Sequence, residues 1–236
     1  MVCLEGLRIT VSICRAESFL IRKYRPEDRV ELRKIACDTA FRGDCVEHFF
    51  DDRDIMADAL TSQFIDYEPE SCFVAVHRDK VVGYLIGSRD VRRSRKLFIC
   101  KVLPRLLVKA VVRRALFSRK NRTFSSHVLR SFIKGEFRIP DYSAIYPATL
   151  HINVDRDFRG KGIGSGLIGA YLNYLAEQGV RGAHLETMSE TAASFFEKQG
   201  FQLLYSREQS YFRYLLRTNI SLMIFAAPTS EEKSYR

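Results

Sequence analysis

The sequence lacks the features that direct a chain into a membrane, into the secretory pathway or around a metal. No stretch of about 18 apolar residues is free of charged side chains, so no membrane-spanning helix is expected. The N-terminus has no basic start and is interrupted by charged side chains, which argues against a secretory signal. The cysteines form no C-x-x-C pair, which predicts free thiols, no metal site and a cytoplasmic protein. They are Cys3, Cys14, Cys37, Cys45, Cys72 and Cys100.

Acidic residues are nearly absent from one part of the chain. Positions 89–122 hold thirteen Lys and Arg against one acid, Asp90, so this segment carries +12 and the rest of the chain −2. Apolar residues at helical spacing predict a helix over 102–117 with a basic stripe along it. The apolar residues are Leu103, Leu106, Leu107, Ala110 and Val111, and the basic ones are Lys101, Arg105, Lys109 and Arg113.

Three interpretations of this basic segment stay open. It is a helix that packs its apolar face on the domain and has a solvated cationic face, or it makes a weak membrane-surface contact through 97–117, where Leu103, Leu106, Leu107 and Phe117 are flanked by cations. Nucleic-acid binding is disfavoured because aromatic residues for base stacking are sparse. The charge can also attract an acidic acceptor or an anionic cofactor.

The rest of the chain alternates short strands with amphipathic helices. At 236 residues and 46% apolar content, without repeats, we expect one α/β domain over 1–236 with a basic helical insertion at about 89–140. Strands are expected at 18–24, 71–77, 80–88, 150–154, 183–187 and 201–206, with YFRYLL and ISLMIFA completing a sheet. Helices are expected from Pro26 to Thr39 and over 51–65, 163–178 and 191–199, with a polar connection after the basic helix. The buried stripe expected for 163–178 is Ile163, Leu167, Tyr171, Tyr174 and Leu175.

Four glycines stand at every second position in FRGKGIGSG, residues 158–166, between a predicted strand and a predicted helix. Glycine loses more backbone freedom on folding than other residues, so such a run is costly. The first N–H groups of a helix have no intrahelical partner and attract anions. We interpret the run as a phosphate-binding loop, although a sharp turn alone is the alternative. In this interpretation Gly160, Gly162 and Gly164 let a diphosphate approach the main chain, and Arg159 and Lys161 add charge.

A dinucleotide site is a second interpretation of the same glycines. GSGLIG, residues 164–169, is a literal G-x-G-x-x-G, and Glu186 follows about 22 residues later. The spacing argues against it, because the loop of such a site leaves its strand almost at once and Val154 lies ten residues before Gly164.

A third interpretation uses more of the residues. Arg159-x-x-Gly162-x-Gly164 after a strand resembles the signature of the GNAT superfamily of acyl-CoA N-acyltransferases, and ASFFEKQGF, residues 193–201, resembles its second helix. The resemblance covers about 20–88 and 148–206, and YPATLHINV is similar to a bacterial subgroup related to hexosaminidase-associated acetyltransferase-like domains. It implies a mixed, mostly antiparallel sheet, splayed at the cofactor, with helices on both faces.

The resemblance also implies a cofactor, acetyl-CoA, and the residues that bind it. Its pantetheine arm is expected beside the strand ending at Val154, and a backbone N–H near Ile152 or Asn153 is expected to face the thioester carbonyl. The residues expected to bind the cofactor are Ile152, Asn153, Val154, Arg159, Gly160, Lys161, Gly162, Ile163, Gly164, Ser165, Ser189, Ser194 and Phe196.

The attacking amine must lose a proton, so a base should lie within reach. Glu186, His151 and Asp155 are the candidates, because they lie on or beside the two strands that flank the cofactor. Each has a structural alternative. His151 can be a hydrogen-bonded strand residue, Glu186 a cap of the next helix, and Asp155 a partner of Arg156 or Arg159.

Two positions depart from the family pattern. Phe196 stands where the family commonly has the Tyr that protonates the leaving thiolate, and Ser189 stands near its Asn. Tyr142, Tyr146 or Tyr205 could substitute as the acid. We expect an N-acetyltransferase acting on an unidentified small-molecule or protein amine. The alternative is an acyl-CoA-binding module without turnover.

Overall fold

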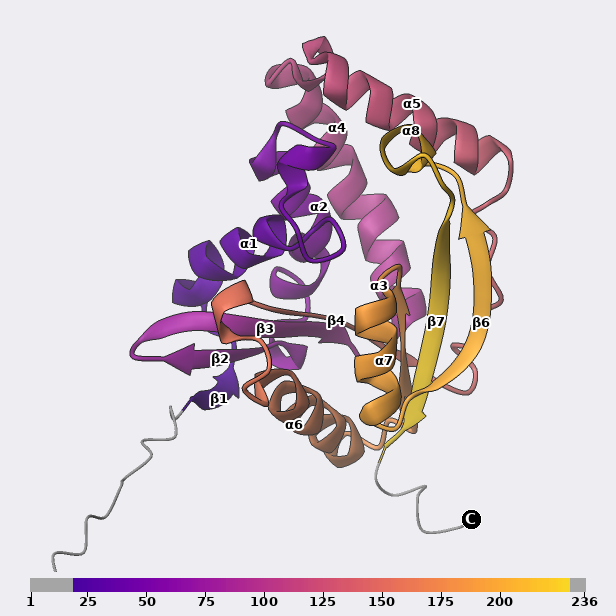
Figure 1. Ribbon diagram of the computed structural model, residues 1–236. Coiled ribbons are helices and arrows are strands. Elements are labelled where there is room, and N and C mark those ends of the chain that lie inside the picture. Colours follow the sequence, from indigo (N-terminus) through magenta and orange to yellow (C-terminus); the bar gives the residue numbers. More distant parts are fainter. Residues whose placement is uncertain (1–18, 230–236) are drawn as a thin grey trace, which may run out of the picture.

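The computed structural model describes residues 19–229 (Figure 1). The described residues form one seven-stranded sheet in the order β1-β2-β3-β4-β5-β7-β6. Only β4 and β5 pair in parallel, and the other neighbours are antiparallel. The predicted mixed, mostly antiparallel fold class is confirmed. The strands are β1 (Leu20–Lys23), β2 (Phe73–His77), β3 (Lys80–Ser88), β4 (Ala148–Val154), β5 (Gly182–Thr187), β6 (Gln202–Gln209) and β7 (Ile220–Pro228).

The sheet opens between its two parallel strands. β4 pairs with β3 at six residue positions but with β5 at only two, Ala148 with Ala183 and Thr149 with His184. Beyond these positions β4 and β5 separate, and the backbone of β4 from Leu150 onward has no strand partner on its β5 side. The separation is the splay that the resemblance implies, and we call it the β4–β5 divergence.

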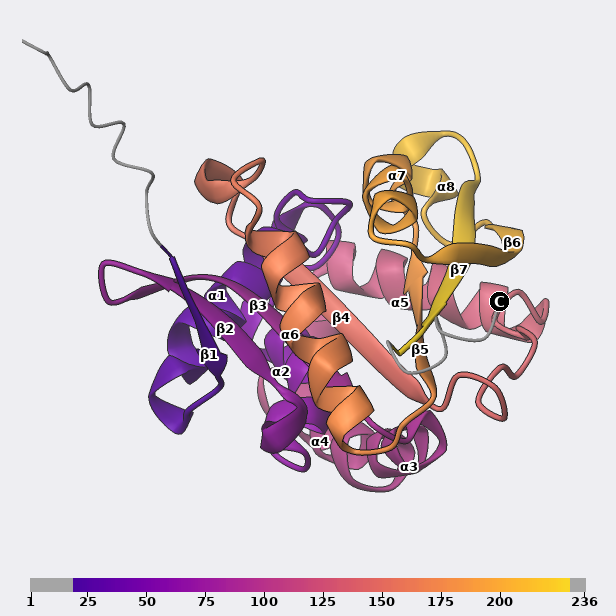
Figure 2. The same cartoon turned by 90° about the horizontal axis from the view of Figure 1, so that it is seen from below.

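Helices cover both faces of the sheet, as expected. In Figure 1, α1 and α2 lie above strands β1 to β4 and α6 lies below them, and Figure 2 shows α6 crossing these strands from the underside. The predicted stripe of α6 is buried against the sheet. The helices are α1 (Arg29–Asp38), α2 (Arg53–Ile65), α3 (Val91–Leu97), α4 (Leu103–Val112), α5 (Arg119–Ile133), α6 (Ile163–Glu177), α7 (Glu190–Lys198) and α8 (Arg213–Leu216).

Short helical turns join several of these elements. Pro26 opens the turn η1 (Pro26–Asp28), which leads directly into α1 at the expected helix start. A π-helical segment, η4 (Phe98–Val102), joins α3 to α4 without a break. The turns η2 (Val46–His48), η3 (Pro69–Ser71), η5 (Ala115–Phe117) and η6 (Arg156–Phe158) lie in the loops.

The basic insertion differs from its predicted form. The helix expected over 102–117 begins at Val91, because the side chain of Asp90 accepts hydrogen bonds from the N–H groups of Arg92 and Arg93 as an N-cap. It ends at Val112 rather than at 117. The expected polar connection after it contains a further helix, α5, whose mostly polar sequence hides the spacing of its inward-facing residues.

The stripe expected to pack on the domain is mostly exposed. Of its five apolar residues only Leu106 is buried, whereas Leu103, Leu107 and Val111 are open to solvent. The basic stripe instead faces inward in part, since Lys109 reaches Asp54 at 2.6 Å and Asp58 at 2.5 Å. These ion pairs orient α4 against α2.

Further contacts hold the insertion in place. Arg113 pairs with Asp52 at 2.6 Å and Lys120 with Asp51 at 2.6 Å. Near the start of α5, buried Asn121 accepts a hydrogen bond from the N–H of Asp51 and donates one to the carbonyl of Ala115. The single domain over 1–236 stays a prediction, but these contacts tie the insertion to α2.

Of the two C-terminal stretches expected to complete the sheet, only one forms a strand. ISLMIFA forms β7 as expected, but the stretch YFRYLL is not a strand. Tyr211 and Phe212 are both buried in one aromatic cluster, which a strand with alternating faces does not allow, and α8 follows them. This part of the prediction was wrong.

Candidate active site

The side chains of β4 divide between the two faces of the sheet. Ile152 and Val154 pack against the core cluster that includes the buried residues of α6, so His151 and Asn153 point to the opposite face, which carries α1 and α2. Asn153 Nδ2 donates to Tyr84 Oη at 2.9 Å, on that same face. The polar side chains of β4 therefore lie beside the divergence, on the side of the insertion.

The backbone of β4 offers a free donor at the divergence. The N–H of Asp155 donates to the carbonyl of Val82 on β3 at 2.9 Å. N–H groups alternate in direction along a strand, so Asn153 also points its N–H toward β3, whereas Ile152 points its N–H toward the β5 side. Of the two expected donors, Ile152 is thus the one with a free N–H.

The glycine loop connects β4 to α6 at the entrance to the divergence. Asp155 begins η6 by accepting a hydrogen bond from the N–H of Asp157 at 3.1 Å. Gly160 and Gly162 then adopt φ values of 76° and 81°, a backbone region that L side chains rarely enter. A Cβ at either glycine would meet no atom within 4 Å, so open space lies in front of this backbone.

The first turn of α6 presents unpaired N–H groups to this space. The first intrahelical bond runs from the N–H of Gly166 to the carbonyl of Gly162 at 3.0 Å. The N–H groups of Ile163, Gly164 and Ser165 therefore have no intrahelical acceptor. At the positive end of a 15-residue helix they form an anion-binding turn.

The charged residues of the loop are partly engaged with the protein. Arg159 donates from Nε to the carbonyl of Val154 at 3.1 Å and from Nη2 to the carbonyl of Gly43 at 3.2 Å. The Nζ of Lys161 lies 5.0 Å from the ring of Phe158. Both side chains remain exposed beside the glycines, so their charge reaches the open space.

Gly164 was expected to let a diphosphate approach the main chain, but in the structure it makes room for a neighbouring helix. A Cβ there would lie 2.9 Å from Phe195 Cζ, so its absence permits the close approach of α7 to α6. Gly166 is likewise close to Ile21, and Gly169 lies in the middle of α6. GSGLIG is thus helix interior rather than a turn, which contradicts the dinucleotide interpretation.

The residues predicted on α7 occupy two environments. Ser189 caps the helix by accepting a hydrogen bond from the N–H of Ala192, so Glu186 is not the cap of this helix. Phe196 is buried in the core and packs edge-on against Phe201. Exposed Ser194 lines a pocket of about 540 Å³ next to the first turn of α6, with Glu190, Thr191, Phe195 and Lys198.

Glu186 is the candidate base that faces the insertion. Its neighbour Leu185 is in the core, so the carboxylate points to the opposite face, 4.0 Å from Arg95 Nη2 on α3. Burial raises the pKa of Glu186 above its usual range, and the charge of Arg95 acts against this rise. The side chain of Glu186 is still 43% exposed. Its carboxylate is therefore surrounded by protein on several sides but remains open to solvent.

The other two candidate bases are engaged in hydrogen bonds. His151 Nε2 lies 2.9 Å from Asn153 Nδ2, and burial lowers the pKa of His151 to about 4. Neutral His151 thus accepts from the amide, which gives it the structural role considered above. Asp155 caps η6, and Arg156, one of its two proposed partners, pairs with Asp44 instead.

Two residues beside Glu186 were not found from the sequence. Arg95 was counted only in the charge of the insertion, and Tyr211 was assigned to a strand. Burial, and secondarily the charge of Glu186, raises the pKa of Tyr211, and its hydroxyl donates to Met188 Sδ at 2.8 Å. In the sequence, Arg95 stands out only as part of the basic segment, and Tyr211 only as part of the aromatic pair Tyr211-Phe212. Neither feature indicates that the residue lies near Glu186.

The tyrosines considered as substitute acids lie elsewhere. Tyr142 donates to the carbonyl of Leu204 on β6 at 3.3 Å, and Tyr205 is itself on β6, two strands beyond β5. The ring of Tyr146 lies against Gly182, where β4 and β5 are still paired. None of these contacts is at the open part of the divergence.

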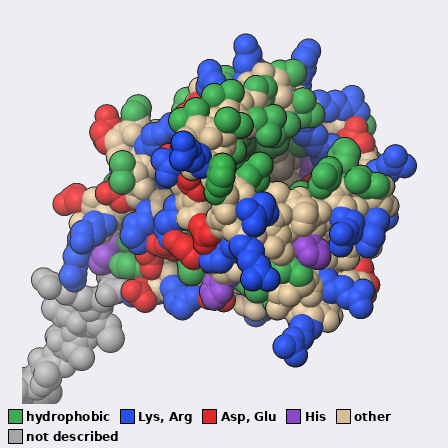
Figure 3. All heavy atoms as spheres, turned by 90° about the horizontal axis from the view of Figure 1, so that it is seen from above, with side chains coloured by type: hydrophobic (Ala, Val, Ile, Leu, Met, Phe, Trp, Pro, Cys, Tyr) green, Lys and Arg blue, Asp and Glu red, His purple; other side chains and the backbone are tan. Residues whose placement is uncertain are grey.

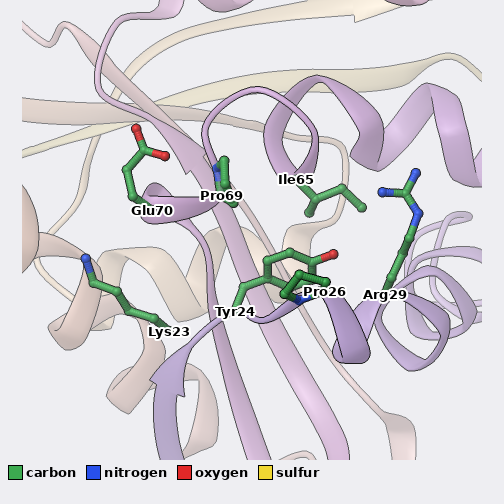
Figure 4. Close-up of a pocket in the computed structure, with 7 residues that line it drawn as sticks. All are labelled: Lys23, Tyr24, Pro26, Arg29, Ile65, Pro69 and Glu70. Carbon is green, nitrogen blue, oxygen red and sulfur yellow. The ribbon is translucent and has the colours of Figure 1, made fainter.

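A second pocket, of about 490 Å³, lies at the far edge of the sheet (Figure 4). Its charged residues already have partners, since Arg29 pairs with Asp66 at 2.5 Å and Lys23 Nζ lies 4.3 Å from the ring of Tyr174. Two strands separate β1 from β4, so this pocket is distinct from the divergence. Its lining residues are Lys23, Tyr24, Pro26, Arg29, Ile65, Pro69 and Glu70.

Two kinds of site are not found in residues 19–229. No helix there is long and apolar enough to cross a bilayer. Nor do three His, Cys, Asp or Glu side chains within this range gather as ligands for a metal ion.

Comparison with known proteins agrees with this geometry. The family model of the acetyltransferase (GNAT) domain matches residues 131–203, which include β4, the glycine loop, α6, β5 and α7. No curated protein matches the sequence.

Solved structures match over nearly the whole chain. The structure of SsHAT has a TM-score of 0.66 and 24% identity, and the match covers 90% of this chain and 99% of that one. A polyamine N-acetyltransferase of Drosophila melanogaster, which forms N-acetylagmatine, has a TM-score of 0.58 and 15% identity over 89% and 100%. YncA, a putative acetyltransferase of Salmonella typhimurium solved with acetyl-CoA, has a TM-score of 0.53 and 13% identity over 90% and 95%.

The chain therefore has the fold of the GNAT acetyltransferases, and its residues 131–203 match a GNAT acetyltransferase domain, which supports the predicted superfamily. The structure of YncA contains acetyl-CoA, which agrees with the cofactor predicted for such a domain. The relation to the hexosaminidase-associated subgroup and the individual site residues stay predictions.

Proposed function

We propose that this protein transfers an acetyl group from acetyl-CoA to the nitrogen of an amine. The observation that carries the proposal is the β4–β5 divergence, with a free N–H inside it and an anion-binding turn at its entrance. The exposed glycines leave room for a diphosphate at the three N–H groups of α6. The residues present thus fit coenzyme A.

Each reacting group has a residue in a suitable place. When bound, acetyl-CoA supplies the acetyl group, and its C–S bond breaks as the amine nitrogen becomes acylated. The N–H of Ile152 donates to the carbonyl oxygen as that oxygen becomes negative. Glu186 accepts the proton that the amine loses, directly or through a water. Phe196 has no proton to give, so the leaving thiolate takes its proton from solvent.

The acceptor is proposed only as an amine, small or on a protein. The polyamine enzyme among the similar structures favours a small amine. Arg95 beside Glu186 disfavours an acceptor with a second positive charge close to the reacting nitrogen. A panel that contains a polyamine, an aminosugar, an amino acid and a peptide N-terminus separates these classes.

The second candidate function is acyl-CoA binding without turnover. The observation that favours it is Phe196. This buried residue occupies the position of the usual acid, and its side chain has no proton to donate to the leaving thiolate. Calorimetric titration with acetyl-CoA followed by a thiol-release assay on the amine panel distinguishes the two. Transfer predicts binding and release with at least one amine, whereas the binding module predicts binding with release on none.

A further inference from the structure

Exposed hydrophobic side chains are concentrated on the insertion. Of the seventeen large hydrophobic residues exposed in the described chain, twelve lie between Ile99 and Phe137. Figure 3 shows hydrophobic side chains gathered on the face that it views, with Lys and Arg side chains around them. Exposed apolar residues scattered singly are ordinary, but a cluster of this kind marks an interaction surface.

The helix that runs from α3 through α4 is apolar on two opposite faces. Val102 and Leu106 are buried on the side that faces α2. The outer side carries further large apolar residues that are exposed, beside Lys101 and Arg105. Apolar side chains clustered on the outer side of a helix mark a surface that contacts protein or lipid. We call six exposed residues on this outer side the apolar patch: Ile99, Leu103, Leu107, Val108, Val111 and Val112.

The cations of the insertion divide into two groups. Lys109, Arg113 and Lys120 face inward and pair with aspartates at or near the start of α2. Lys101 and Arg105, on the helix that carries the apolar patch, are exposed and have no carboxylate partner among residues 19–229. The same holds for Arg114 and Arg119 at its end. The outer cations are therefore available to an external anion.

We infer that the apolar patch and its outer cations dock this protein on an anionic lipid bilayer surface. Apolar side chains enter the boundary between headgroups and acyl chains, and cations attract anionic headgroups, so a bilayer satisfies both features at once. A second copy of this chain would bring the same cations against them. A nucleic acid would satisfy the cations but leave the patch in water.

The test is co-flotation of the full-length protein with vesicles of phosphatidylcholine, with or without phosphatidylserine. Binding is expected to the vesicles that contain phosphatidylserine and to weaken with added salt. The charge variant Lys101→Gln/Arg105→Gln should weaken this binding roughly tenfold or more. Its matched control is Lys80→Gln, a change to an exposed cation on β3.

A second variant tests the apolar part. Leu107→Glu/Val111→Glu should abolish flotation, because both side chains lie more than half open on the patch. The matched control Val30→Glu changes a residue on α1 that is 74% exposed and should leave flotation unchanged. Unchanged acetyl-CoA binding in each variant shows that the fold is intact.

Three results would overturn the inference. One is flotation with neither kind of vesicle, and another is equal binding to both, which would remove the role of charge. The third is association of the protein with itself, or with an acidic protein, that Leu107→Glu/Val111→Glu abolishes while vesicles remain unbound. Each is independent of turnover, so it leaves the proposed acetyl transfer untouched.

Discussion

The carboxylate of Glu186 on β5 lies 4.0 Å from the guanidinium of Arg95 on α3, although 91 positions separate them in the chain. This contact brings the insertion to the edge of the β4–β5 divergence. In the proposed reaction the insertion therefore forms one wall of the acceptor side, in addition to an outer surface. The charge of Arg95 also acts against the rise that burial causes in the pKa of Glu186, the group that we propose as the base.

Replacement of Glu186 tests that role. Glu186→Gln keeps the size of the side chain and removes the proton acceptor, so kcat should fall at least about tenfold. The dissociation constant of acetyl-CoA, measured by calorimetry, should change little because the carboxylate is not part of the glycine loop. The matched control is Glu177→Gln on the exposed end of α6, which should keep full activity. Normal turnover in Glu186→Gln would exclude it as the base.

Arg95 should control the pH dependence of the reaction. The base acts when deprotonated, so the rate falls as the pH drops through the pKa of Glu186. Arg95 lowers that pKa against the effect of burial, so Arg95→Ala should raise it and move the acid limb of kcat/KM to higher pH. Arg95→Lys should restore the wild-type limb. A uniform loss of rate with no displacement of the limb would instead indicate a structural role.

The sequence was most informative where one element carries its own signal. The stripe of α6 could be predicted because its five residues recur at helical spacing and bury one face. A glycine loop before a helix start could also be predicted, and in the structure Gly160 and Gly162 of this loop have positive φ values. The splay could be expected only from the resemblance, because the sequence of one strand does not show how far it pairs with its neighbour.

Relations across elements were not accessible in this way. α4 has apolar residues on both sides, so spacing could not tell which side is buried. The inner side of α4 is fixed by Lys109 and Arg113, which pair with aspartates some 50 to 60 positions earlier in the chain. Glu186 was a candidate from its place on β5, but Arg95 and Tyr211 reach it from two other elements. The helix α5 was not predicted, because most of its residues are polar and show no clear apolar spacing.

Gly162 and Gly169 form a matched pair for the phosphate loop. Gly162 has a φ of 81°, so Gly162→Ala should strain the loop by about 1–2 kcal/mol and weaken acetyl-CoA binding roughly tenfold. Gly169 lies in α6 with open space at its Cβ position, so Gly169→Ala should stabilise the helix by up to about 1 kcal/mol. Calorimetry and thermal unfolding of both variants give the comparison. Equal acetyl-CoA affinity in the two would contradict the loop's proposed role.

Asn121 provides a test of how the insertion is held. Its side chain is buried and joins the N–H of Asp51 to the carbonyl of Ala115 across two segments. Asn121→Ala leaves these two backbone groups without that partner, so the free energy of unfolding in urea should fall by about 2 kcal/mol. Ser126→Ala, an exposed position on the same helix, should change it by less than about 0.5 kcal/mol. Hydrogen exchange should rise in α5 while α6 stays protected, because α6 packs on the other face of the sheet. Equal effects of the two substitutions would mean that the insertion is held by its ion pairs and aromatic contacts alone.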